Sequence, residues 1–149
     1  MTETISLLKL LTNIERAGVY GSTISADEIV AAAKTLGLRV FKLDIGGARG
    51  KSGILERFAK ALRFPDHFGK NWDALNDCLS DLSWLDGKGW VLIVCNGKAF
   101  AENYQGEFNV AIDILNRAVE SWREQGKPFW VLVEAQDGWH PELPNITDK

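Results

Sequence analysis

Three aspartates at four-residue spacing are the residues of this 149-residue chain whose types and positions point most directly to chemistry. At about 100° per residue of helix, Asp73, Asp77 and Asp81 advance by only about 40° at each step and share one face. Like charges at this spacing cost an isolated helix about 0.2–0.5 kcal/mol per pair. The opposite face of the same segment is apolar and carries the side chains of Trp72, Leu75, Cys78, Leu79 and Leu82. The pattern predicts a helix with one core face and one face that binds cations or is simply solvated.

The position of one of the three carboxylates, Asp73, can be explained by helix capping alone. Asn71 is a preferred N-cap residue and places Asp73 in the first turn, where a negative charge interacts favourably with the helix dipole. Asp77 and Asp81 lie one and two turns further along, and no lysine or arginine stands three or four residues from either. Solvation and the binding of a cationic partner therefore both stay open for these two residues.

The segment Phe68–Leu79 resembles the signature of the barstar-like family, whose members are intracellular inhibitors of bacterial ribonucleases. It reads FGKNWDALNDCL, which matches an aromatic residue, glycine, any residue, asparagine, an apolar residue, Asp-Ala-Leu, any residue and Asp-Cys-Leu. The resemblance extends from about Arg39 to Glu134. It implies a loop and an acidic helix that plug the active-site cleft of a basic, barnase-like ribonuclease or a related toxin. Asp73 and Asp77 would face the cations that otherwise hold RNA phosphate.

The resemblance also predicts which side chains contact the partner. The type inhibitor of the family has an acidic residue in place of Lys70, a tyrosine in place of His67 and a tryptophan in place of Asn76. A glutamate of its last long helix falls at Glu120 or Ser121. These departures concern the identity of the partner more than the mode of binding. The predicted partner-binding residues are Asp73, Asp77, Asn71, Gly69, Phe68, His67, Trp72 and Asp81, with Phe68 as the exposed aromatic anchor of the loop.

Composition and charge agree with a small binding domain. A chain with 46% hydrophobic residues and six tryptophans can bury one sizeable core, which predicts a single domain. The net charge of −3 disfavours direct nucleic-acid binding, which normally requires a basic patch. Cys78 and Cys95 have neither disulfide nor metal-ligand spacing, so they are expected to be buried thiols in a reducing cytoplasm. The N-terminal apolar run is too short for a signal or membrane segment. No metal, cofactor or membrane contact is expected.

The hydrophobic pattern predicts an α/β fold with a small three-stranded parallel sheet packed with helices. Strands are expected over 38–45, 89–95 and 128–133, and the nearly all-apolar composition of the last two suits burial on both faces. Helices are expected over 52–63, in the acidic segment, and in a long element that ends at Gly126. An extra N-terminal helical pair covers 5–16 and 25–36, where Ser25–Glu28 resembles a capping box. The domain would comprise a helical extension (1–37), a barstar-like core (38–134) and a loop-like tail (135–149).

A glycine-rich turn offers one competing function. Gly46–Ser52 follows a predicted strand and opens a predicted helix, which is the context of a P-loop. That motif needs four residues between its first glycine and Gly-Lys-Ser, and Ile45 stands where the first glycine should be. Neither later strand ends in an aspartate that could hold magnesium. His67 beside Asp66 could serve as an acid–base pair, but no nucleophile accompanies it. A nucleotide-hydrolysing enzyme is the less favoured alternative.

The function expected from the sequence is therefore inhibition of a cationic ribonuclease, without catalysis by this chain. The alternative is an interaction or immunity module of the same fold that targets a partner other than a ribonuclease. Lys70, Asn76 and the added helical pair favour this alternative, because each departs from the type inhibitor.

Overall fold

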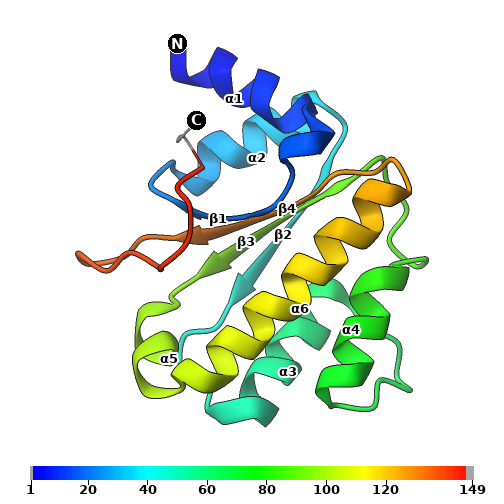
Figure 1. Ribbon diagram of the computed structural model, residues 1–149, viewed down its shortest axis with the longest axis vertical. Helices are drawn as coiled ribbons and strands as arrows, with labels where there is room; N and C mark the ends of the chain where they lie inside the picture. Colours follow the sequence, from blue (N-terminus) through cyan, green and yellow to red (C-terminus); the bar gives the residue numbers. More distant parts are fainter. Residues whose placement is uncertain (1, 147–149) are drawn as a thin grey trace.

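Four parallel strands form the central sheet of the computed structural model, which describes residues 2–146 and the side chains of residues 7–146. All of the pairings between these strands are parallel, so the four carboxyl ends lie at the same edge of the sheet (Figure 1). The predicted α/β class with a parallel sheet is confirmed. In order across the sheet, the strands are β1 (Val19–Ser22), β4 (Phe129–Glu134), β3 (Trp90–Cys95) and β2 (Arg39–Asp44).

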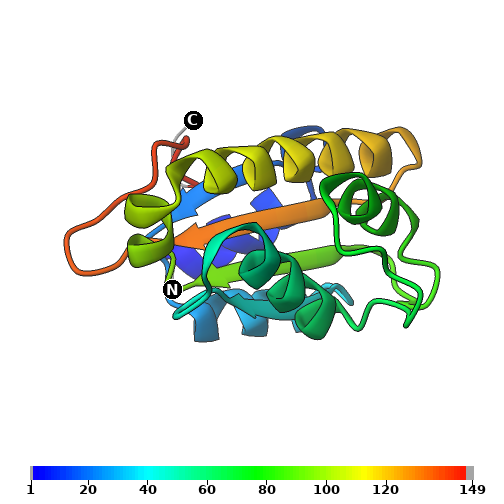
Figure 2. The ribbon, with the colours of Figure 1, turned by 90° about the horizontal axis from the view of Figure 1, so that it is seen from below.

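Helices cover both faces of the sheet (Figure 2). The connection from β1 to β2 crosses the sheet in one direction, and the connections from β2 through β3 to β4 return. Right-handed crossovers that run in opposite directions place their helices on opposite faces, which accounts for the two layers. The back layer holds α1 (Thr2–Thr12) and α2 (Ala26–Thr35), and the front layer holds α3 (Gly50–Leu62), α4 (Trp72–Asp81), α5 (Lys98–Asn103) and α6 (Gln105–Glu124).

The prediction of three strands is wrong, because β1 adds a fourth at the edge beside β4. Only its first two residues favour a strand, and Gly21 weakens the pattern. The backbone of Gly21 bonds to the C-terminal tail, with N–H to the Pro144 carbonyl at 2.8 Å and its own carbonyl to Ile146 N–H at 2.9 Å. A Cβ at Gly21 would lie 3.0 Å from Cγ of Pro141. Tertiary contacts rather than local propensity therefore define this strand.

The N-terminal helices are present, with differences at their ends. The N-cap half of the predicted capping box is present, since Oγ of Ser25 accepts a hydrogen bond from Glu28 N–H at 3.2 Å, while among the described residues the Glu28 side chain does not bond back to Ser25. The helix expected over 5–16 is divided at Asn13 into α1 and a 3-10 turn, Ile14–Arg16. Asn13 Oδ1 accepts from Glu15 N–H at 3.2 Å, as a polar side chain does where a helix begins anew. The short α5 was not predicted.

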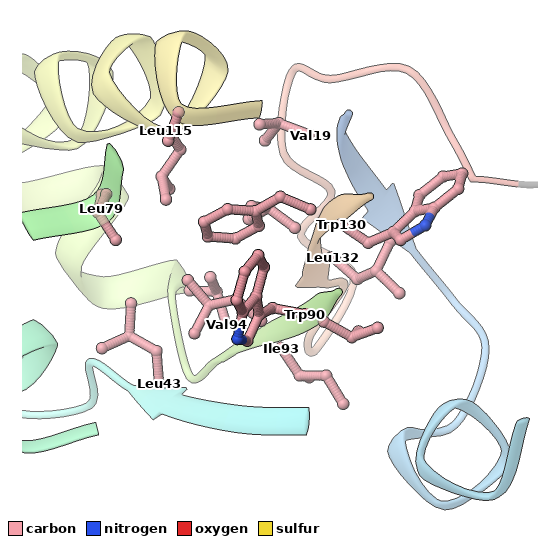
Figure 3. Packing of buried hydrophobic residues seen from close by; sticks show 14 of the residues in the cluster. Val19, Leu43, Leu79, Trp90, Ile93, Val94, Leu115, Trp130 and Leu132 are labelled. Atoms are coloured by element: carbon pink, nitrogen blue, oxygen red, sulfur yellow. The ribbon is translucent and has the colours of Figure 1, made fainter. Parts of the chain in front are cut away.

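Apolar side chains fill both faces of the two central strands (Figure 3). On the front face, Trp90 packs on Trp122 with ring centroids 4.5 Å apart. On the back face, Trp130 is fully buried and stacks with Tyr20 at 6.0 Å. The indole N–H of Trp130 is the buried side-chain donor without a hydrogen-bond partner among the described residues, and an unmet donor of this kind costs about 1–3 kcal/mol.

Substitution of Gly89 by alanine should destabilise the protein by about 2 kcal/mol, because the added methyl group would clash with neighbouring segments at the point where β2, β3 and β4 begin. A Cβ at this position would lie 2.7 Å from the Pro128 carbonyl oxygen and 2.9 Å from Cδ2 of Leu38. Gly106→Ala in α6 is the matched control, since its Cβ would meet nothing within 4 Å. Urea denaturation should show a loss for Gly89→Ala and no loss for Gly106→Ala. Equal stability of the two variants would contradict this account of the packing.

Candidate protein-binding site

The acidic helix α4 begins at a side-chain cap, as the sequence predicts. Asn71 is the N-cap residue, and its Oδ1 accepts a hydrogen bond from Ala74 N–H at 2.8 Å. Its Nδ2 donates to the Gly69 carbonyl at 3.3 Å, which ties the preceding loop to the cap. The helix ends at Leu82, whose φ of 46° lies in the left-handed region typical of helix C-termini.

The inner side of α4 and the chain around it are held by indole hydrogen bonds to carbonyl oxygens. Trp122 on α6 donates to the Leu79 carbonyl within α4 at 2.8 Å. Trp84, just after α4, donates to the Leu62 carbonyl at the end of α3 at 2.8 Å. Leu75 and Leu79 are fully buried between these helices. The helix therefore has one defined orientation relative to the sheet.

The outer side of α4 exposes carboxylates. Asp73 and Asp77 are exposed, and within the described part of the chain neither has a hydrogen-bond or ion-pair partner. We call these two residues the aspartate pair. Asp81 is also exposed, but its Oδ2 accepts a hydrogen bond from Ser83 Oγ at 3.3 Å. Among the described residues, two of the three carboxylates are therefore free, whereas the third is hydrogen-bonded at the end of the helix.

The loop before α4 is anchored by aromatic rings. Phe68 is half-buried and packs edge-on against Phe64, with centroids 4.9 Å apart. Phe64 in turn packs against Trp84 at 5.9 Å. The expectation of an exposed Phe68 is therefore corrected, because one face of its ring belongs to the core. The loop exposes Asp66, His67, Gly69 and Lys70, as well as the cap residue Asn71, and Lys70 adopts a φ of 51°.

Two further positions border the acidic helix. Trp72 is half-buried and packs against the core, so only part of its ring is accessible. On α6, Glu120 is exposed and Ser121 is half-buried. Arg123 donates to the Ile14 and Ala17 carbonyls on the β1 side of α6. Ser121 precedes Arg123 by two positions, which is about 200° of rotation around the helix. It therefore lies on the side of α6 opposite Arg123, toward α4.

The two thiols are free and half-buried rather than fully buried as expected. Burial raises the pKa of the Cys78 thiol, and the negative charges of Asp81 and Asp77 raise it further. Burial, followed by a hydrogen bond with Glu134, raises the pKa of Cys95 to about 12. In the described part of the chain no His, Cys, Asp and Glu side chains gather as metal ligands. None of its helices is both long and apolar enough to cross a bilayer.

The first residue of the glycine-rich turn at Gly46–Ser52 bonds to a carboxylate. Asp44 Oδ1 accepts hydrogen bonds from Asn96 Nδ2 and from Gly46 N–H, both at 2.9 Å. These two bonds, the Asn96 bond first, lower the pKa of Asp44 and keep it charged. Gly46 N–H is therefore occupied by the protein's own carboxylate, and the two bonds tie the end of β2 to the end of β3.

Removal of the Asn71 cap and removal of the Asp77 charge should affect stability in opposite ways. Asn71→Ala should lower the free energy of unfolding by about 1 kcal/mol, because Ala74 N–H loses its partner. Asp77→Ala should leave it unchanged or raise it by up to about 0.5 kcal/mol, because a like-charge neighbour is removed. Both values can be measured by chemical denaturation. A large loss for Asp77→Ala would show that this carboxylate supports the fold.

Comparison with known proteins assigns most of this chain to one family. The model of the family described as Barstar (barnase inhibitor) matches residues 38–134, which include β2, the acidic helix and β4. A Bacillus subtilis (strain 168) protein named "Putative ribonuclease inhibitor YrdF" is 33% identical over 73 residues, covering 49% of this chain and 74% of that protein. The match to the family model spans more than half of the chain, and this protein therefore belongs to the barstar (barnase inhibitor) family.

Proposed function

We propose that this protein inhibits a cationic ribonuclease by inserting α4 and the preceding loop into the active-site cleft of the enzyme. The observation that carries the proposal is the aspartate pair, two exposed carboxylates that have no partner among the described residues and lie on a helix anchored from behind. Family membership supports the same function, and so does the printed name of the Bacillus subtilis relative. Asp73 and Asp77 would occupy the positions of RNA phosphates and accept charge-assisted hydrogen bonds from arginine, lysine and histidine of the enzyme.

The free state of the aspartate pair favours binding. Neither carboxylate has to leave an ion pair within the described part of the chain before it meets the enzyme. The Asn71 cap and the Trp122 hydrogen bond already hold the helix in place, so less conformational entropy is lost on association. The desolvation of two carboxylates in a cleft is costly, and only a strongly cationic site offsets it. The proposed target is accordingly a basic enzyme.

The mechanism requires no chemistry from this chain. Inhibition is stoichiometric and lasts as long as the complex. An acidic face and a cationic cleft attract each other over about a Debye length, which raises the association rate at low salt. Such an inhibitor would protect the cell that synthesises the enzyme, so the proposed site of action is the cytoplasm before export of the ribonuclease.

One observation favours a second candidate within the same fold. Lys70 is exposed in the loop beside the aspartate pair, where it adds a positive charge to an otherwise acidic surface. A partner with an acidic group near its cationic site would accommodate both signs of charge. A toxin other than a ribonuclease could have such a site, and the protein would then act as an immunity module.

The inhibitor proposal can be tested by titrating purified basic ribonucleases, barnase among them, with the protein while following cleavage of a fluorogenic RNA. The wild-type protein should reduce cleavage with a one-to-one end point. Asp73→Asn combined with Asp77→Asn should weaken inhibition by more than about 2 kcal/mol, or about 30-fold in Kd, because buried cations of the enzyme lose their partners. Rising salt should slow association of the wild-type protein.

A matched variant with Glu15→Gln and Glu28→Gln controls for net charge. It removes two exposed carboxylates that belong to the N-terminal layer and should inhibit like the wild type. Equal losses in both double variants would contradict a role specific to the aspartate pair. If the wild type inhibits none of the enzymes but captures a non-ribonuclease toxin through this pair, the immunity alternative holds.

A further inference from the structure

A groove of about 630 Å³ lies between the N-terminal half of α6 and the C-terminal tail. It shares no residue with α4 or with the loop before it. Its apolar lining includes Phe108, Ile112 and Trp139. Its carboxylates are Glu102 on α5, Asp113 on α6 and Glu142 in the tail. We call it the acid-rimmed groove.

The walls of the groove are held in place by the fold. Trp139 packs against Phe108 with ring centroids 6.3 Å apart and an angle of 73°. Gln136 and Trp139 exchange backbone hydrogen bonds of 3.0 and 2.7 Å, which close a tight turn. Beyond this turn, the tail bonds to both backbone groups of Gly21 on β1. The groove therefore exists before any partner arrives and requires little ordering on binding.

The charges along the groove define what it can accept. Of the described residues that line it, three are carboxylates, one is the exposed His140, and none is lysine or arginine. A phosphate or a nucleic acid would be repelled there. The accessible part of the Trp139 ring and the side chain of Ile112 suit a cationic group on a long apolar stem. Arginine combines these features, because its guanidinium stacks on indole and pairs with carboxylates.

We propose that the acid-rimmed groove is a second docking site, which binds a basic, arginine-containing segment of a protein. It lies beside α5 and the first half of α6, whereas α4 lies beside the second half of α6 (Figures 1 and 2). The two sites can be occupied at the same time, and this second site does not depend on the proposed ribonuclease inhibition. A protein that engages one partner through α4 can be recruited by another through the groove.

The test uses the full-length ¹⁵N-labelled protein and the peptide acetyl-Arg-Leu-Arg-amide as probe. Titration should move the indole N–H resonance of Trp139 saturably, together with backbone resonances around Asp113. The charge-reversed peptide acetyl-Glu-Leu-Glu-amide should move neither. Acetyl-Lys-Leu-Lys-amide should bind several-fold more weakly, because lysine stacks less well on indole and cannot pair bidentately.

Two double variants distinguish docking in the groove from general attraction to an acidic protein. Asp113→Asn with Glu142→Gln should weaken binding of the arginine peptide by about tenfold. Asp73→Asn with Asp77→Asn removes the same charge from the other site and should leave the peptide affinity unchanged. All four residues are exposed, so both variants should retain the wild-type spectrum elsewhere.

Three results would overturn the proposal. One is the absence of a saturable shift at Trp139. Another is an equal loss of affinity in the two double variants, which would indicate non-specific electrostatics. The third is a concentration-dependent shift of groove resonances without peptide, accompanied by dimer formation in sedimentation, because the occupant would then be a second copy of this chain.

Discussion

The position of α4 depends on hydrogen bonds that three tryptophans donate to backbone carbonyls. Trp122, Trp84 and Trp90 bind the carbonyls of Leu79, Leu62 and Leu85, at 2.8, 2.8 and 3.1 Å. Each bond contributes about 1 kcal/mol net, and an indole N–H left buried without its partner costs about 1–3 kcal/mol. The rings of Trp122 on α6 and Trp90 on β3 also pack on each other with centroids 4.5 Å apart, so a displaced α6 would lose packing as well as hydrogen bonds. This arrangement defines where the outer face of α4 points.

Anchoring on one side allows unfavourable charge on the other. Repulsion between successive aspartates costs only about 0.2–0.5 kcal/mol per pair, which is small beside the indole hydrogen bonds and the burial of Leu75 and Leu79. The fold therefore tolerates two carboxylates that no cation of the described residues pairs with. Asp81 differs, because Ser83 binds it at the end of the helix. The potential for recognition is concentrated on Asp73 and Asp77, while the stability of the helix comes from the residues behind them.

How much the sequence could predict depended on the range of the interactions. The Asn71 cap, the Ser25 N-cap and the strands β2, β3 and β4 follow from local patterns, and the structure has all of them. The strand β1 could not be predicted, because Gly21 pairs with β4 and with a tail more than a hundred residues away. Phe68 was expected to be exposed, since its contact with Phe64 depends on the path of the loop. The acid-rimmed groove was also missed, because residues 101–113 meet residues 139–143 only after folding.

The N-terminal extension contributes to the sheet rather than to the acidic surface. The family model begins at residue 38, so α1, β1 and α2 lie outside the matched part. On the back face α1 and α2 cover the sheet, and Tyr20 of β1 stacks on the buried Trp130 of β4. Burial of such a surface stabilises the fold by roughly 25 cal/mol per Å². Because α4 lies on the opposite face, this layer can support the core without approaching the aspartate pair. At the same time β1 provides the edge to which the tail bonds, so the extension that stabilises the sheet also holds the tail that forms one wall of the groove.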